Sequence, residues 1–310
     1  AITFAEAARR FIDAKSDEWR NGKHRTQWEN TLVTYAFPIM GKLLVQDVKQ
    51  SHVLAVLEPI WKEKTETASR LRGRIESILD WATARHYRTG ENPARWRGHL
   101  DHILAKPTKI ARVKHHSALP VDDVAAFMID LRKREGPAAR ALELAILTAT
   151  RSGEVRGATW AEIDLNAATW TIPASRMKAG REHRVALSDP AVKLLRALPR
   201  FEDTDLVFPG SKGKQLSDMT LTAVMRRMNV DAVPHGFRST FRDWVSERTR
   251  YPHELAEMAL AHTIGNKVEA AYRRGDMLEK RRQMMAAWAR YCEAPPAIGG
   301  KVFMLAKGAK

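Results

Sequence analysis

The sequence contains a single cysteine, Cys292, among its 310 residues. One thiol excludes an internal disulfide and every cysteine-based zinc motif. No apolar run is long enough to span a bilayer, because the best one, 141–149, is interrupted by Glu143. No signal peptide precedes the first expected helix. We therefore expect a cytoplasmic protein with no membrane partner.

Nucleotide and metal motifs are also missing. The sequence has no G-x-x-x-x-G-K-[ST] stretch and no cluster of acidic residues that would hold magnesium. Metal-dependent nucleases and transposases need such carboxylates. We predict that the chemistry of this chain uses no metal and no cofactor.

Positive charge is what the sequence has in excess. Its 52 Lys and Arg against 36 Asp and Glu give a formal net charge of +16. Such an excess usually indicates a polyanionic partner, either nucleic acid or an acidic membrane surface. Without a membrane segment, nucleic acid is favoured. A basic but merely solvated surface would explain the charge alone equally well.

Changes of pattern along the chain predict two domains. Residues 1–105 have helical periodicity throughout, and 121–293 mix helical and strand patterns. Between them, 106–120 has a proline near each end, four basic residues and no acid, so it is predicted to be an extended linker on a DNA backbone. Its predicted DNA contacts are Lys106, Lys109, Arg112 and Lys114. A tail, 294–310, follows. The predicted fold class is mainly α with a small antiparallel sheet in the second domain, the two domains forming a clamp on DNA.

In the first domain, Thr3 and Glu6 predict a capping box at the start of the first helix. A second helix is expected to stop before Pro38, and a third to run from Ser51 to the Glu58–Pro59 step. The clearest helix, 67–87, has arginines beside its apolar stripe. These are candidate DNA contacts, in a bundle that equally fits a plain helical bundle made soluble by arginine: Arg70, Arg74, Arg85 and Arg88.

The second domain is predicted to begin with helices, including a buried one at 138–150. Two strands, 169–173 and 183–187, would be joined around Gly180. Helices are expected to return after Ser188 and at 217–228, 236–247, 253–261 and 268–292.

Six side chains of this domain make a coherent chemical set. In chain order they are Arg151, Lys178, His235, Arg238, His262 and Tyr272. Only the two imidazoles are good metal ligands. Guanidiniums bind phosphate oxygens in pairs, and a phenol can act as a nucleophile. The set therefore fits a phosphodiester that is attacked by tyrosine.

The segments ATRSGE, MKAGREHRVALS, HGFRSTFRDW and LAHTIGNKVEAAY resemble the catalytic domain of the tyrosine recombinases, in particular integrases of phages and genomic islands. The resemblance covers about 118–293 strongly. It extends more loosely over 1–105, as that family's core-binding domain.

The resemblance implies a role for each residue. Arg151 and Arg238 would clamp the scissile phosphate, and His262 would contact the phosphate or hold the nucleophile. Tyr272 would attack, with His235 accepting its proton and Lys178 protonating the leaving 5′-oxygen. Glu154 would support the arginines and histidines.

Some of these assignments have competitors. Tyr251 precedes a proline in a turn and Tyr291 lies near a helix end, so Tyr272 is preferred by its position after a histidine. Lys178 is crowded by three arginines (Arg176, Arg181 and Arg184), and a hairpin lysine is usually just solvated. Ala261 stands where the family usually has glycine. Trp244 and Trp288 fit core packing better than base stacking.

The implied function is site-specific recombination through a 3′-phosphotyrosine intermediate, to integrate or excise a mobile element. A type IB topoisomerase-like strand transferase and a catalytically inactive DNA-binding regulator are the alternatives. The expected partners are double-stranded attachment sites, three further copies of this chain in a tetramer on DNA, and DNA-bending or directionality proteins, all at the nucleoid.

The ends of the chain raise two further expectations. Integrases of this group often carry an additional amino-terminal domain for arm-type DNA sites, and we expect one upstream of Ala1. The apolar tail residues 302–305 are expected to pack on a neighbouring protomer.

Overall fold

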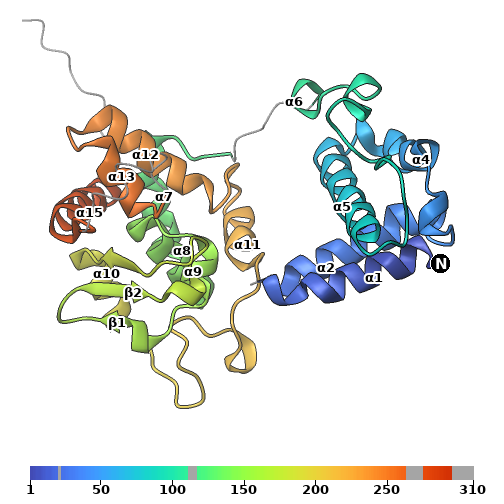
Figure 1. Ribbon diagram of the computed structural model, residues 1–310. Coiled ribbons are helices and arrows are strands. Elements are labelled where there is room, and N and C mark those ends of the chain that lie inside the picture. Colours follow the sequence, from blue (N-terminus) through green and yellow to red (C-terminus); the bar gives the residue numbers. More distant parts are fainter. Residues whose placement is uncertain (20–21, 111–116, 263–274, 295–310) are drawn as a thin grey trace, which may run out of the picture. The chain divides into compact units, whose positions relative to one another are not determined.

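The first of two compact units, Ala1–Lys114, is built from helices in the computed structural model (Figure 1). The structure describes residues 1–19, 22–110, 117–262 and 275–294. The longer helices of this unit are α1 (Phe4–Lys15), α2 (Gly22–Thr31), α4 (Gln50–Trp61) and α5 (Thr65–Ala84), with the short α3 (Phe37–Met40) and α6 (Pro107–Ile110). None of the described helices is long and apolar enough to cross a membrane.

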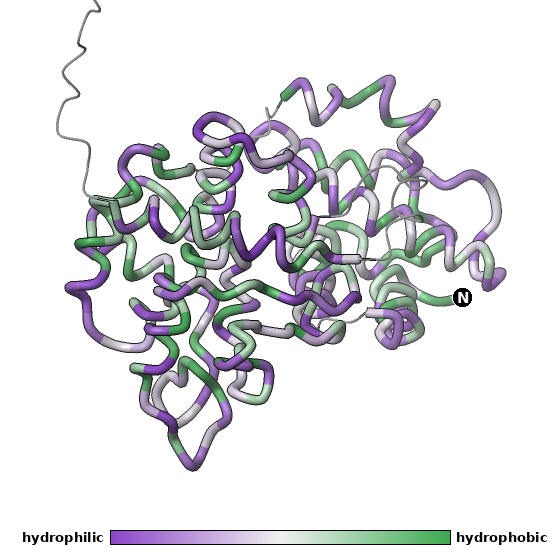
Figure 2. The backbone as a smooth tube through the Cα atoms, turned by 90° about the vertical axis from the view of Figure 1, so that its left-hand side faces the viewer, coloured by the Kyte–Doolittle hydropathy of each residue, from purple (hydrophilic) through white to green (hydrophobic). Residues whose placement is uncertain are grey.

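The predicted cap of α1 is present. The Glu6 backbone N–H donates to Thr3 Oγ1 at 3.2 Å, which satisfies one of the free amides of the first turn. The carboxylate of Glu6 bonds Arg10 instead. The apolar residues of the helix face the core of the unit: Phe4, Ala7, Ala8, Phe11 and Ile12. Figure 2 shows such alternation of hydrophobic and hydrophilic residues along the helices.

The expected helix stop before Pro38 is wrong. A π-helical turn, Leu32–Ala36, follows α2 directly, and α3 continues from it with Pro38 in its first turn. Proline has no N–H for the helical ladder and its ring crowds the preceding turn, and the π-helical turn directly before it changes the hydrogen-bond register there, with the Phe37 N–H bonded to the Leu32 carbonyl. Helix α4 likewise runs through Pro59 and ends at Trp61.

The linker prediction is wrong at both ends. Residues 107–110 form α6, and Ile110 packs on the core of the first unit. Ser117 and Leu119 belong to the second unit, where Ser117 Oγ donates to the Asp231 carbonyl at 2.8 Å and Thr240 Oγ1 donates to the Leu119 carbonyl at 2.6 Å. Residues 111–116 lie outside the described residues.

The second unit, His115–Lys310, has helices around a small sheet. In its described part the sheet has three antiparallel strands in the order β1-β2-β3, with Ile163 opposite Trp170 and Ile172 opposite His183. Strands β2 and β3 match the prediction, and β1 adds two residues that it missed. The bounds are α7 (Val124–Arg132), α8 (Pro137–Thr148), α9 (Ser152–Arg156), β1 (Ile163–Asp164), β2 (Thr169–Ile172), β3 (His183–Ala186), α10 (Asp189–Arg196), α11 (Thr220–Arg227), α12 (Gly236–Arg248), α13 (His253–Ala259) and α15 (Leu278–Glu293).

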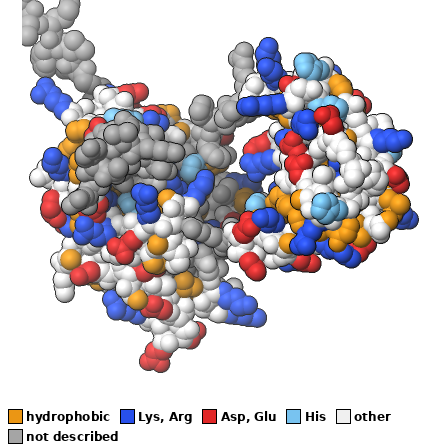
Figure 3. All heavy atoms as spheres, in the orientation of Figure 1, with side chains coloured by type: hydrophobic (Ala, Val, Ile, Leu, Met, Phe, Trp, Pro, Cys, Tyr) orange, Lys and Arg blue, Asp and Glu red, His pale blue; other side chains and the backbone are white. Residues whose placement is uncertain are grey.

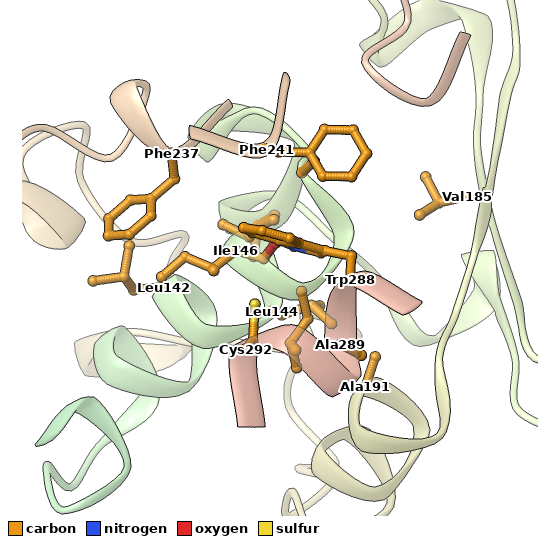
Figure 4. Close-up of a cluster of buried hydrophobic side chains, with 14 of the residues drawn as sticks. Leu142, Leu144, Ile146, Val185, Ala191, Phe237, Phe241, Trp288, Ala289 and Cys292 are labelled. Carbon is orange, nitrogen blue, oxygen red and sulfur yellow. The ribbon is translucent and has the colours of Figure 1, made fainter. Parts of the chain in front are cut away.

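Trp288 occupies the middle of the core of this unit (Figure 4). Its indole is fully buried against Phe241, and its Nε1–H donates to the Ile146 carbonyl of α8 at 2.8 Å. Trp244 is also buried and lies beside Trp288. The prediction that both tryptophans are core residues is confirmed.

The last long helix begins later than predicted. Gly275, Asp276 and Met277 are not helical, Met277 has a left-handed backbone with φ of 50°, and α15 starts at Leu278. Two arginines hold this start in place. Arg184 on β3 binds both carboxylate oxygens of Asp276 at 2.8 Å, and the buried Arg281 donates to the Asp276 carbonyl at 2.8 Å.

Candidate active site

Arg151 stands at the start of the short helix α9. Its backbone N–H donates to Glu154 Oε2 at 2.8 Å and its Nη1 donates to Glu154 Oε1 at 2.7 Å. The buried carboxylate of Glu154 therefore does two things at once: one oxygen caps the helix start, and the other fixes the guanidinium of Arg151. Arg151 Nη2 also donates to the Ala261 carbonyl at 3.3 Å, across 110 residues of sequence.

Arg238 lies in the first turn of α12 and is 4% exposed. Its Nη1 donates to the Ala149 carbonyl at 2.5 Å and its Nη2 to the Leu260 carbonyl at 2.6 Å. Burial, and after it the positive charge of Arg151, lowers the pKa of this guanidinium to about 10. It therefore stays cationic at neutral pH, beside a second cation.

His262 completes this group from the end of α13. Its Nε2 lies 3.1 Å from Arg238 Nη2, and its Nδ1 lies 2.8 Å from Glu257 Oε2. Two guanidiniums and an imidazole thus meet around the turn Leu260–His262. Four of the predicted residues are brought together here: Arg151, Glu154, Arg238 and His262.

The turn before His262 explains the family's glycine. Ala261 has φ of 48°, the left-handed region that non-glycine residues rarely adopt. The Ala261 N–H donates to the Met258 carbonyl at 3.1 Å and the His262 N–H to the Glu257 carbonyl at 2.9 Å. This pair of bonds is the Schellman motif, whose left-handed position is usually glycine.

His235 lies immediately before α12 and is exposed. The next residue, Gly236, is constrained by a close approach of backbone. A Cβ at this position would lie 2.1 Å from the Ser117 carbonyl oxygen. Only glycine therefore lets the 117–119 segment pack on the helix that holds His235 and Arg238.

Lys178 is exposed in the connection between β2 and β3, and it makes no hydrogen bond or ion pair with the described part of the chain. Arg176 anchors the base of this connection, donating to the Glu154 carbonyl and to Glu162. The Cα of Lys178 therefore lies within about 7 Å of the Cα of Arg176, whose side chain reaches the helix of Arg151 and Glu154. Among its neighbours, Arg184 is likewise engaged, with Asp276.

Tyr272 lies outside the described residues. Its two competitors in the unit have structural partners. The Tyr251 hydroxyl donates to the Gln283 carbonyl at 3.3 Å, and the Tyr291 hydroxyl lies 3.2 Å from Asp122 Oδ1. Burial and the Asp122 carboxylate raise the pKa of Tyr291, which disfavours its phenolate.

His183, the first residue of β3, is a histidine that the sequence reasoning missed. Burial, and after it the charge of Arg281, lowers its pKa to about 4, and a hydrogen bond to the backbone of Ala259 partly opposes this. Its Nε2 is buried and has no hydrogen-bond partner among the described residues. The sequence could have indicated this histidine, because it is the first residue of the second predicted strand, directly after the connection that carries Lys178.

The predicted DNA contacts of the first unit differ in exposure. Arg74 is buried, with Nη1 donating to the Gln27 carbonyl at 2.7 Å and its guanidinium 5.4 Å from the Trp28 ring. Arg88 is buried too, and its Nη2 donates to the Glu91 carbonyl at 3.1 Å. Neighbouring carbonyls and, for Arg74, an indole ring thus take these two candidate DNA contacts into the bundle.

The other basic candidates are on the surface. Arg70, Arg85, Lys106 and Lys109 are exposed, while Arg112 and Lys114 lie outside the described residues. Lys and Arg side chains are spread over both units on the face shown in Figure 3. Within the described ranges, no group of three or more His, Cys, Asp or Glu side chains is arranged to hold a metal ion.

Comparison with known sequences matches both units. Residues 118–279 match the Phage integrase family, and residues 4–99 match the Phage integrase central domain. The integrase of Enterobacteria phage P4 is 31% identical over 94% of this chain and 70% of its own length. Prophage integrase IntA of Escherichia coli K12 is 32% identical over 82% of this chain, which spans 61% of that protein.

Comparison with solved structures matches the fold. A lambda integrase (75–356) dimer bound to a COC′ core site superimposes with a TM-score of 0.64 at 14% identity, covering 89% of this chain and 97% of that one. A lambda integrase tetramer bound to a Holliday junction gives the same TM-score at 15% identity, over 86% of this chain and 79% of that one. The predicted fold class, helices with a small antiparallel sheet, is confirmed.

Proposed function

Since the chain belongs to the phage integrase family of tyrosine site-specific recombinases, we propose that the cluster around the Leu260–His262 turn is its phosphate-binding site. One observation carries the proposal. Arg151, Arg238 and His262 come from three separate segments and converge on that turn, two of them through its carbonyls. Arg238 is buried and Arg151 is partly buried beside it, so their mutual repulsion, offset in part by Glu154 and Glu257, favours the binding of a further anion.

The arginines bind the non-bridging oxygens of the scissile phosphate. Guanidinium offers paired donors that match phosphate geometry, and it stays charged in this site. The charge on those oxygens grows in the five-coordinate transition state, so the interaction strengthens as the reaction proceeds. Glu154 and the turn carbonyls hold the guanidiniums before DNA arrives.

Tyr272 supplies the nucleophile. Its phenolic oxygen attacks phosphorus, the bond from phosphorus to the 5′-oxygen breaks, and a 3′-phosphotyrosine ester forms. A free phenol has a pKa of about 10, so its proton must be removed, and His235 accepts it. The leaving 5′-oxygen takes a proton from Lys178. Because the ester conserves the bond energy, a 5′-hydroxyl reverses the step without ATP.

On DNA, the first unit and the basic residues 106–114 grip the duplex through the phosphate backbone. The solved lambda integrase complexes, a dimer on a core site and a tetramer on a Holliday junction, support a tetramer of this chain on paired attachment sites. DNA-bending and directionality proteins are further proposed partners. We propose a core-binding domain that extends through α6 to Ile110, a catalytic domain from Ser117 to Glu293 and a tail, 294–310.

A nicked suicide substrate carrying candidate attachment-site DNA tests the function, with wild type beside Tyr272→Phe. We expect a covalent protein–DNA adduct that survives denaturation and is absent from the variant. An adduct that persists in Tyr272→Phe moves the nucleophile to another tyrosine. No adduct with either protein on any candidate site, together with salt-sensitive binding, supports the regulator alternative.

A topoisomerase-like activity shares the phosphotyrosine step, so the adduct does not separate the two enzymes. Strand exchange between two defined sites, read on a gel with two labelled duplexes, distinguishes a recombinase from a protein that only relaxes supercoils.

A further inference from the structure

Glu257 is a carboxylate next to His262 that the proposed chemistry does not use. Residue 257 lies in the last turn of α13, three residues before the helix cap Leu260, and residue 262 is the second after that cap. The Schellman motif brings these two positions together, and their side chains usually make an apolar contact there. Here the contact is polar, 2.8 Å between Glu257 Oε2 and His262 Nδ1.

The two contacts of the imidazole fix its tautomer. A carboxylate only accepts hydrogen bonds, so Nδ1 carries the hydrogen that faces Glu257. Arginine only donates, so Nε2 accepts from Arg238 Nη2 at 3.1 Å. Both contacts are satisfied at once by the neutral Nδ1–H tautomer.

That tautomer does not fit a bound phosphate. Phosphate oxygens accept hydrogen bonds, and so does the unprotonated Nε2. His262 can donate to the phosphate only after Nε2 gains a proton from solvent, which turns the ring into an imidazolium. The nearby cations Arg238, Arg151 and Arg242 oppose this added charge, whereas Glu257 offsets it.

We propose that Glu257 is a positioning residue for His262. It holds the ring as the Nδ1–H tautomer in the free protein and balances the imidazolium that forms when phosphate binds, so that binding of the scissile phosphate takes up one proton at Nε2. The first part needs only the contacts described above, and the second rests on the proposed function.

The other charged neighbours of Glu257 define the controls. Arg242 Nε lies 3.0 Å from Glu257 Oε1, and His253 Nε2 lies 3.5 Å from the same oxygen. Both groups lie near Oε1, whereas His262 contacts Oε2. Glu279, 80% exposed beside Arg282, is a matched glutamate outside the site.

Long-range ¹H–¹⁵N spectra of ¹⁵N-histidine-labelled protein test the first part without DNA, with His262→Gln assigning the signal. We expect the Nδ1–H pattern in wild type and in Glu257→Gln, whose amide oxygen still accepts from Nδ1. Glu257→Ala leaves only the Arg238 contact to favour this tautomer, so it is expected to show a larger share of the Nε2–H form. The same Nδ1–H pattern in wild type and Glu257→Ala, or an Nε2–H pattern in wild type, overturns the proposal.

Single-turnover cleavage of the suicide substrate between pH 6 and 9 tests the second part. We expect Glu257→Ala to cleave about 10- to 100-fold more slowly at its optimum, the range seen when a carboxylate that orients a metal-bound histidine is lost. Glu257→Gln keeps the tautomer but loses the negative charge that offsets the imidazolium. As the pH rises, the activity of this variant should therefore begin to fall at a lower pH than that of wild type. Glu279→Gln should match wild type throughout.

Unchanged pH profiles in both Glu257 variants overturn the role in proton uptake. A wild type that shows the Nδ1–H pattern but cleaves no site DNA instead contradicts the proposed function, and leaves the positioning of His262 standing.

Discussion

Two buried arginines, one in each unit, look alike by every local measure. Arg88 is 5% exposed and Arg238 is 4% exposed, and each has an Nε–H without a partner in the described structure. Burial lowers the pKa of both. Yet the charge near Arg88 is the carboxylate of Asp80, while the charge near Arg238 is first of all a second arginine.

This difference separates a structural arginine from one that is proposed to bind phosphate. A buried cation near a carboxylate is already balanced, and it stabilises the fold. Arg238 also has Glu154 and Glu257 nearby, but the charge that acts on it most is a second cation, so a bound anion would complete its balance. An Nε–H without a partner therefore does not identify a binding site by itself. The signs of the neighbouring charges indicate whether a buried arginine is structural or could bind an anion.

The largest expected effect comes from replacing these two arginines by lysine. Arg238→Lys keeps the charge but loses the fork that reaches Ala149, Leu260 and the phosphate, so suicide-substrate cleavage should fall about 10³-fold or more. Arg88→Lys should leave cleavage per folded molecule unchanged and lower thermal stability. Equal losses of cleavage in both variants would show that the neighbouring charges do not distinguish an arginine needed for cleavage from a structural one.

Two glycines extend the comparison to the backbone. Gly236→Ala places a Cβ 2.1 Å from the Ser117 carbonyl, so we expect a loss of about 3 kcal/mol in the free energy of unfolding and impaired cleavage. A Cβ at Gly73, inside α5, meets nothing within 4 Å, so Gly73→Ala should stabilise by about 0.5 to 1 kcal/mol. Urea unfolding of both variants measures this, and a stabilising Gly236→Ala would contradict the close approach.

The buried His183 predicts how the free energy of unfolding depends on pH. Its pKa is about 4 in the folded protein against an ordinary 6.5, so the unfolded chain binds the extra proton between these values. Stability should therefore fall as the pH drops from 6.5 toward 4, by on the order of 3 kcal/mol for this group. His183→Gln should show a smaller loss between pH 7 and pH 5 in urea unfolding. An identical loss would place the titration elsewhere.

The smallest expected effect is at Ala261. The left-handed backbone costs alanine about 1 kcal/mol relative to glycine, so Ala261→Gly should raise the unfolding free energy by roughly that amount. Thermal unfolding measures the gain. A loss of stability would mean that greater freedom of the unfolded chain outweighs the relief of strain.

Much of the site was predictable because it is local in sequence. The histidine and arginine three residues apart at a helix start, and the glutamate three residues after Arg151, occupy the positions that their spacing indicates. The placement of Lys178 between two strands also followed from pattern. The family resemblance then ordered these fragments into one domain.

What escaped prediction depends on tertiary contacts. Periodicity puts Arg74 on the edge of the apolar stripe, but only the approach of Trp28 and the Gln27 carbonyl buries it. The sequence pattern predicted that the last long helix begins at residue 268. In the structure Arg184 and Arg281 hold Asp276 in a non-helical segment directly before α15. A strand of two residues such as β1 has too few side chains to show alternation.

The attachment of the 117–119 segment to α12 has a mechanical consequence. Hydrogen bonds from Ser117 and Thr240 and the close packing on Gly236 leave almost no slack between this segment and the helix that holds His235 and Arg238. Tension applied to the chain at Ser117 would therefore be transmitted to α12 within one turn of Arg238, rather than being taken up by a slack loop.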